Sequence, residues 1–257
     1  MSKNIHDLLI RKLESIGTVS PEARDCVSEL HGEVRSIAAG EDVVREGDHP
    51  THCAMLLSGF VCRYKLLPAG TRQIMSFHQP GDLPDLQSLF LKTMDHSVGA
   101  LVDSDLVLIP HRVMLNIVTR CPDLGHLLWR DTLIDAAIFR EWMIGIGRRN
   151  AYTRIAHLLC ELIVRMRSVR LQDGLRYDLP ITQSDIGDAL GLSNVHVSRT
   201  LRDLEGDELL EYRRGAITVL DWDRLKEAGE FDLTYLHLGP EAARLVENGD
   251  VSAEAGC

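Results

Sequence analysis

Two arginines in the C-terminal half of the chain have the spacing of a surface that contacts DNA. Arg199 and Arg202 share one face of a helical segment with Val195 and Ser198, at positions i, i+3, i+4 and i+7. An arginine guanidinium donates two parallel hydrogen bonds to N7 and O6 of guanine, and it also pairs with phosphates. The pattern therefore indicates a helix that contacts bases in the major groove.

The segment that holds these arginines reads as two short helices joined by a tight turn. Thr182 and Asp185 form a capping box at the start of the first helix. Gly191 permits the turn, and Ser193 caps the second helix. The inward face of that second helix consists of Val197, Leu201 and Leu204. This arrangement is typical of a helix-turn-helix.

The stretch YRRGAITVL at 212–220 predicts a strand, a turn at Gly215 and a second strand. Such a hairpin beside a helix-turn-helix is the wing of a winged helix. Arg213 and Arg214 lie near its tip, where we expect them to contact phosphates.

The net charge of the whole chain is −10, which by itself argues against a nucleic-acid partner. The charge is unevenly distributed, because residues 148–220 carry +1 and the remainder carries −11. DNA binding depends on the charge of the docking face rather than on the global charge. The acidic composition therefore does not exclude DNA.

Other kinds of chemistry find little support. The six cysteines form no C-x-x-C pair, which disfavours a zinc ribbon or an iron–sulfur cluster. His49 and His52 lie near Cys53, but we interpret them as a polar loop rather than a metal or haem site. The sequence lacks a nucleophile elbow, a phosphate loop and an H-E-x-x-H motif. We therefore predict a protein that is not an enzyme, with no metal and no assigned cofactor.

The order of strand-like and helix-like apolar patterns along the chain predicts an α+β protein. Glycines punctuate short apolar stretches between about 34 and 110, as in an all-β roll or jelly roll, and helical periodicity follows Pro110. The predicted parts are N-terminal helices (1–30), a β-roll (31–121), a long dimerisation helix (122–148), a winged helix-turn-helix (149–225), and a C-terminal extension with a mobile tail (226–257). An apolar stripe on the long helix belongs either to the core or to a dimer seam, and we assign it to the seam: Leu127, Ile134, Ile138 and Trp142.

These fragments together resemble the Crp–Fnr family of bacterial transcription regulators. The resemblance rests on VVREGD (43–48), LLSGFV (56–61) and QPGDL (79–83) in the roll, and on TRIA (153–156), ITQSDIGDALGLS (181–193) and VSRTLRDLE (197–205) in the second half. It implies a cyclic-nucleotide-binding-like β-roll, a dimer and a DNA-binding winged helix.

The resemblance also implies how the recognition helix, 193–204, contacts DNA. Arg199 matches the arginine that reads guanine, and Ser198 matches the serine of the Fnr-like branch. Val195 replaces the usual glutamate and can contact a thymine methyl group instead. The predicted DNA-binding residues are Asn194, Val195, His196, Ser198, Arg199, Arg202, Arg213 and Arg214.

The effector site of the family is altered here. Positions that contact cyclic AMP in its receptor protein correspond to Asp85, Leu86, His96, Ser97, Phe139 and Arg140, and only Ser97 is retained. Cyclic AMP is therefore not expected to control the protein. The alternative is a regulator whose roll does respond to a cyclic nucleotide or to another small effector. His78 and His96 are candidate haem ligands, although lone histidines more often form polar surface.

The implied partners are double-stranded DNA, a second copy of the chain and RNA polymerase, while the effector stays unknown. No run of about 18 apolar residues predicts a membrane span, and no signal peptide is visible. We therefore expect a cytoplasmic homodimer.

Overall fold

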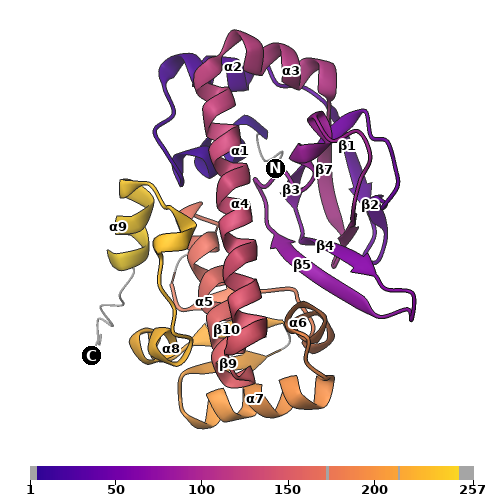
Figure 1. Cartoon of the computed structure of the whole chain (residues 1–257). Helices are drawn as coiled ribbons and strands as arrows, with labels where there is room; N and C mark the ends of the chain where they lie inside the picture. The colour runs from indigo at the N-terminus through magenta and orange to yellow at the C-terminus, as the bar shows by residue number, and fades with distance from the viewer. Residues whose placement is uncertain (1–4, 172–173, 214, 249–257) are drawn as a thin grey trace. The chain divides into compact units, whose positions relative to one another are not determined.

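The computed structural model describes residues 5–171, 174–213 and 215–248. The chain folds into two compact units that divide between Met143 and Ile144. Figure 1 labels the main helices and strands of both units. The division falls inside a helix that the sequence assigned to dimerisation. None of the helices in the described ranges is long and apolar enough to cross a membrane.

Unit 1 begins with two helices, α1 (Ile5–Glu14) and α2 (Pro21–Ser28). Ser20 caps α2, since its hydroxyl accepts the N–H of Ala23 over 3.2 Å, and Pro21 fills the first helical position. The buried face of α1 consists of Leu8, Leu9 and Leu13.

The middle of unit 1 is the predicted β-roll. Its elements are β1 (Glu33–Ile37), β2 (Asp42–Val44), β3 (His52–Ser58), β4 (Val61–Leu66), β5 (Arg72–His78), the 3-10 helix η1 (Leu86–Leu89), β6 (Ser97–Ala100) and β7 (Ser104–Pro110). The strands form two antiparallel sheets, ordered β1-β7-β3 and β2-β6-β4-β5. Both sheets supply one core cluster: Ile37, Val44, Ala54, Leu56, Val61, Met94, Val98, Ala100 and Leu106. The predicted α+β fold with an N-terminal roll is confirmed.

Glycine turns separate the strands, as the spacing of the glycines predicted. Gly59 shows why the residue type matters at the turn between β3 and β4. Its φ is 90°, and a Cβ atom would lie 2.1 Å from Ser104 Oγ and 2.7 Å from Asp103 O. Only glycine permits both this conformation and this close approach.

Helix α3 (His111–Arg120) follows the roll, and the next helix, α4 (Pro122–Arg148), begins in unit 1 and ends in unit 2. The predicted dimer seam on α4 requires correction. Its four side chains are each at most 9% exposed within the single chain: Leu127, Ile134, Ile138 and Trp142. The Trp142 ring lies 5.8 Å from that of Phe77 on β5. This stripe is therefore part of the core of the single chain rather than an exposed seam.

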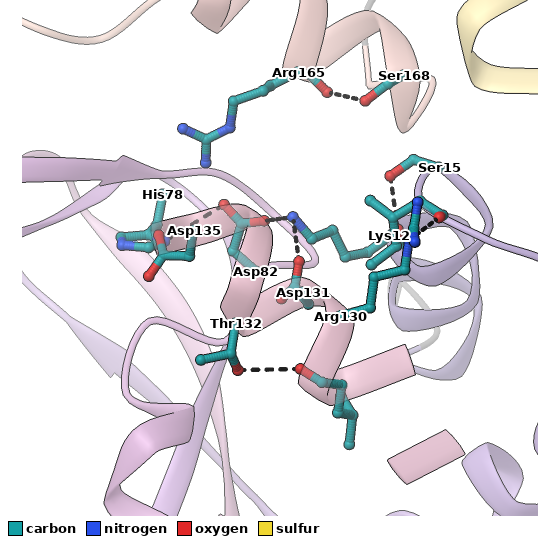
Figure 2. A network of polar contacts seen from close by, with 12 residues as sticks. Lys12, Ser15, His78, Asp82, Arg130, Asp131, Thr132, Asp135, Arg165 and Ser168 are labelled. Atoms are coloured by element: carbon teal, nitrogen blue, oxygen red, sulfur yellow. Dashed lines mark hydrogen bonds and ion pairs between the residues drawn. The ribbon is translucent and has the colours of Figure 1, made fainter. Parts of the chain in front are cut away.

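A partly buried lysine joins the N-terminal helices to the roll and to α4. The Nζ atom of Lys12 lies 2.9 Å from Asp82 Oδ1 and 3.2 Å from Asp131 Oδ1, between the two carboxylates (Figure 2). Arg130 also joins α4 to the segment after α1, because its Nε donates to the carbonyl of Ile16 over 2.7 Å. Buried charges are tolerated when they are paired in this way.

Unit 2 contains the predicted winged helix. Its elements are α5 (Ala151–Ser168), β8 (Arg176–Asp178), α6 (Gln183–Leu190), α7 (Asn194–Gly206), β9 (Leu210–Arg213), β10 (Ala216–Val219), α8 (Trp222–Ala228), the 3-10 helix η2 (Thr234–Leu236) and α9 (Pro240–Asn248). The sheet order is β8-β10-β9, and α5 packs against α7, α8 and α9. The predicted mobile tail is wrong for 240–248, which form α9 with Ala242 and Val246 buried. Residues 249–257 lie outside the described part of the chain.

Candidate nucleic-acid interface and effector site

The turn between α6 and α7 is built by local interactions that the sequence predicted. Thr182 and Asp185 form a reciprocal capping box, since the Thr182 N–H donates to Asp185 Oδ2 over 2.8 Å and the Asp185 N–H donates to Thr182 Oγ1 over 3.1 Å. Gly191 ends α6 with a φ of 66°. A Cβ atom on Gly187 would lie 2.6 Å from the carbonyl oxygen of Leu192, so α6 and the turn approach closely.

Helix α7 presents the predicted polar and basic face to solvent. Asn194, Arg199 and Arg202 are exposed, and Val195 is 80% exposed. His196 and Ser198 are partly exposed at the edges of this face. The opposite face is buried and consists of Val197, Thr200, Leu201 and Leu204. An apolar side chain as exposed as Val195 at the first turn of a helix suits contact with a thymine methyl group.

Two contacts fix the wing to the helix-turn-helix. The backbone N–H of Tyr212 donates to Glu205 of α7 over 3.0 Å, and the Tyr212 hydroxyl donates to the carbonyl of Ile181 over 2.6 Å. Arg213 at the end of β9 is exposed. Arg214, which the sequence assigned to phosphate contact, lies outside the described residues.

Arg154 positions the helix pair, a role that the sequence analysis missed. Its Nη1 donates to the carbonyl of Leu190 over 2.8 Å, at the C-terminal end of α6. A cation at the C-terminus of a helix satisfies a carbonyl that has no partner within the helix. The only signal in the sequence was the place of Arg154 in the TRIA motif.

The residues assigned to the effector site differ in burial and in their partners. Asp85 is buried, and its Oδ1 accepts the N–H of Ala54 over 2.7 Å. Leu86 lines an apolar cavity of about 690 Å³ with Phe90 and Trp129. Phe139 and Arg140 are exposed on α4. The burial of Asp85 opposes its ionisation.

His96 does not supply the missing cation. Its Nδ1 lies 2.7 Å from Asp95 Oδ1, and its Nε2 lies 3.2 Å from the Gln87 amide nitrogen. Burial, and then the charge of Arg63, lower the pKa of His96, so the imidazole is neutral near pH 7. Ser97 is already engaged, because its hydroxyl accepts the N–H of Glu46 over 3.0 Å.

The roll does hold a cation, which the sequence analysis missed. Arg63 on β4 is partly buried, its Nε donates to the carbonyl of Pro84 over 2.6 Å, and its Nη1 pairs with the carboxylate of Asp135 on α4. The ion pair joins residues far apart in the sequence, so no local motif marks it. The charge of Arg63 is thus compensated by the chain itself.

His78 is not polar surface, contrary to the expectation for a lone histidine. It is 4% exposed at the end of β5, 2.8 Å from the hydroxyl of Ser76 and 3.6 Å from Asp82. Burial is the main reason that its pKa is lowered to about 4. His96 is likewise buried, at 8% exposed. Both rings are used in hydrogen bonds within unit 1.

Comparison with known proteins gives independent evidence on both units. A cyclic nucleotide-binding domain matches residues 34–121, and a Crp-like helix-turn-helix domain matches residues 153–228. The transcriptional activator protein FnrL of Cereibacter sphaeroides is 30% identical over 202 residues, which cover 76% of this chain and 80% of FnrL. The nitrogen fixation regulation protein FixK of Rhizobium meliloti is 30% identical over 182 residues, covering 70% and 79% of the two chains. The structure of FixK2 from Bradyrhizobium japonicum has a TM-score of 0.70 at 27% identity, covering 77% of this chain and 98% of FixK2.

The burial of Asp85 predicts an unusual dependence of stability on pH. Burial raises its pKa from 3.8 to about 7, against the opposing effects of the Ala54 N–H and Arg63. The folded state therefore keeps a proton that the unfolded state has lost, and Asp85 lowers stability as the pH rises from about 4 to 7. Asp85→Asn keeps the acceptor oxygen without the charge. Relative to the wild type, we expect its free energy of unfolding to increase by about 1.4 kcal/mol per pH unit in that range.

Urea titrations of both proteins between these pH values measure the difference. The matched control is Asp103→Asn, which changes an exposed carboxylate that also accepts a backbone N–H, from Ala39. A difference between Asp85→Asn and the wild type that stays constant with pH would show that Asp85 ionises normally.

Proposed function

The chain belongs to the Crp–Fnr family of transcription regulators, which bind DNA through a helix-turn-helix. From this premise we propose that α7 reads an inverted-repeat operator in the major groove. The observation that carries the proposal is the exposed face of α7, with Asn194, Val195, Arg199 and Arg202 beside a buried opposite face. Within the part of the chain that the structure describes, Arg199 has no ion-pair partner, so its guanidinium is available for guanine.

The active form that we propose is a homodimer joined along α4 on a revised seam. Exposed residues of α4 recur at alternating spacings of four and three, at positions 129, 133, 136, 140 and 143. Position 140 is Arg140, and the other four residues are apolar: Trp129, Leu133, Ala136 and Met143. This spacing is that of a two-stranded coiled coil. Exposed apolar side chains of this size are otherwise unfavourable in water, and Trp129 and Leu133 are 68% and 58% exposed.

We also propose that cyclic AMP does not control DNA binding. A cyclic phosphate inside the roll needs a cation and hydrogen-bond donors to replace its lost hydration. The nearby cation, Arg63, is compensated by Asp135, while His96 is neutral and Leu86 offers no acceptor for a ribose hydroxyl. Contact with RNA polymerase, a cytoplasmic location and the lack of an enzymatic activity complete the proposal, and all three rest on the family.

Replacing Arg199 should reduce sequence preference more than general affinity for DNA. We expect Arg199→Ala to lose about 1–3 kcal/mol on a selected operator and little on a scrambled duplex, because one bidentate base contact is removed. Arg213→Ala is the matched control, since loss of a phosphate contact should weaken both duplexes equally and lower the salt slope by about one. Fluorescence titrations on both duplexes distinguish the two roles. Equal losses on both duplexes for Arg199→Ala would contradict base reading.

A charge in the revised seam should separate the subunits. Leu133→Glu places a carboxylate at the centre of the exposed apolar stripe, and we expect monomers in sedimentation velocity and weak operator binding. Thr132→Glu puts the same charge on the neighbouring exposed residue at the edge of the stripe, where water still reaches it, and should weaken the dimer much less than Leu133→Glu. A wild-type monomer, or a Leu133→Glu dimer, would remove the seam from this face.

Calorimetry with cyclic AMP tests the effector proposal directly. We expect no binding heat with the wild-type protein and the same operator affinity with and without the nucleotide. Asp135→Asn releases Arg63 from its counter-charge, so any gain of binding in this variant would identify the ion pair as the cause. A micromolar dissociation constant together with tighter operator binding would instead support the alternative of a cyclic-nucleotide-responsive regulator.

A further inference from the structure

The apolar cavity of unit 1 takes no part in the proposed DNA contacts. Its walls come from three places in the sequence: η1 with the residues that follow it, helix α3, and the first turns of α4. Of the six positions predicted for the effector site, Leu86 alone lines it. The cavity therefore differs from the predicted cyclic-nucleotide site.

The size and the surface of the cavity favour a small apolar ligand. Its volume of about 690 Å³ lies within the range of about 300–1,000 Å³ that is common for small-molecule sites. Three of its lining side chains are large, apolar and exposed: Phe90 at 74%, Trp129 at 68% and Leu91 at 57%. Apolar side chains that gather in one exposed hollow mark a site of interaction.

The polar groups of the cavity are few. Among the described residues that line it there is no lysine, arginine, aspartate or glutamate, and the polar side chains are Gln87, His126 and Thr132. The Thr132 hydroxyl donates to the carbonyl of Leu128 over 3.1 Å, and Gln87 Nε2 lies 3.2 Å from His96 Nε2. Within the described ranges, neither the Gln87 amide oxygen nor the His126 ring has a hydrogen-bond partner.

This lining decides the charge of a ligand. An anion in the cavity loses hydration and finds no lysine or arginine to compensate its charge. A neutral molecule avoids that cost, and one polar group on it can hydrogen-bond to Gln87 or His126.

We propose that this cavity binds a neutral aromatic molecule that carries one hydrogen-bonding group. Its rings pack against Phe90 and Trp129, since aromatic contacts add to the free energy gained from buried apolar area. Binding removes both exposed side chains from water, which is the main driving force.

Gly125 leaves the cavity open on the side of α4. The backbone does not require glycine at this position, because its φ is not positive. A Cβ atom would lie 3.5 Å from the Val118 carbonyl oxygen and 3.7 Å from Val118 Cβ, which are ordinary contacts. An alanine therefore fits, whereas the longer side chain of a leucine fills part of the cavity.

The ligand site does not depend on the proposed dimer. All its lining residues belong to unit 1 of a single chain, although Trp129 is also part of the revised seam. Measuring binding and oligomeric state on the same samples therefore separates the two proposals.

Two fluorescent probes with the same rings test the site on the full chain at pH 8. N-phenyl-1-naphthylamine is neutral, carries one N–H and emits more strongly in apolar surroundings, and 1-anilinonaphthalene-8-sulfonate adds a sulfonate. We expect the neutral probe to saturate at one molecule per chain with a micromolar dissociation constant. The sulfonate should bind at least about tenfold more weakly, because the cavity supplies no lysine or arginine for it.

Substitutions in the walls locate the probe. Phe90→Ala changes an exposed side chain and should weaken binding of the neutral probe about fivefold or more. Gly125→Leu should abolish binding, whereas Gly125→Ala should bind like the wild type. The matched control for Phe90 is Phe139→Ala, which changes an exposed phenylalanine of α4 outside the cavity and should leave the affinity unchanged.

Three results would overturn the proposal. The first is equal affinity for the neutral probe in the wild type, Phe90→Ala and Gly125→Leu, and the second is equal affinity of the wild type for both probes. The third is binding by the Leu133→Glu monomer but not by the wild-type dimer, which would show that the second copy fills the cavity. Binding by a wild-type monomer would support the ligand site and contradict only the seam.

Discussion

The ion pair between Arg63 and Asp135 joins strand β4 to helix α4, and much of unit 1 depends on it. A guanidinium that is largely removed from water is costly unless a carboxylate and hydrogen-bond acceptors compensate its charge. Asp135 and the Pro84 carbonyl supply both. Asp135 lies beside the buried face of α4, which includes Ile134 and Ile138, while Leu133 stays in solvent. The proposal that cyclic AMP does not control the protein and the proposed seam on α4 both refer to this pairing.

The helix-turn-helix could be predicted from the sequence because local interactions specify it. A capping box spans only Thr182 to Asp185, and the turn needs one residue with positive φ, which Gly191 provides. The inward and outward faces of α7 follow from helical periodicity alone, and Val197 and Arg199 lie where that periodicity puts them. The turns of the roll were predictable for the same reason, since glycines mark them.

The face of α4 and the effector region could not be predicted in this way. Helix α4 is apolar on more than one side, so periodicity finds Ile134 and Ile138 as readily as Trp129 and Leu133 and cannot say which pair faces the roll. Only contacts that are distant in the sequence decide it, such as Phe77 with Trp142. The effector residues were predicted by comparing single positions with the cyclic-AMP site of the family. Arg63 and Asp135 are not among those positions, so the comparison did not find their ion pair.

The C-terminal extension packs on α5, the helix whose Arg154 contacts the end of α6. Residues 229–248 lie beyond the Crp-like match, yet they pack on α5 through His157, whose two ring nitrogens lie 2.9 Å from the Gly229 carbonyl and 3.1 Å from the Tyr235 hydroxyl. The Tyr235 hydroxyl donates to the buried Glu161 over 2.9 Å, so a carboxylate inside unit 2 has a hydrogen-bond partner from the extension. Helix α5 also carries Arg154, which binds the end of α6. The extension therefore stabilises α5, the helix whose Arg154 contacts the end of α6.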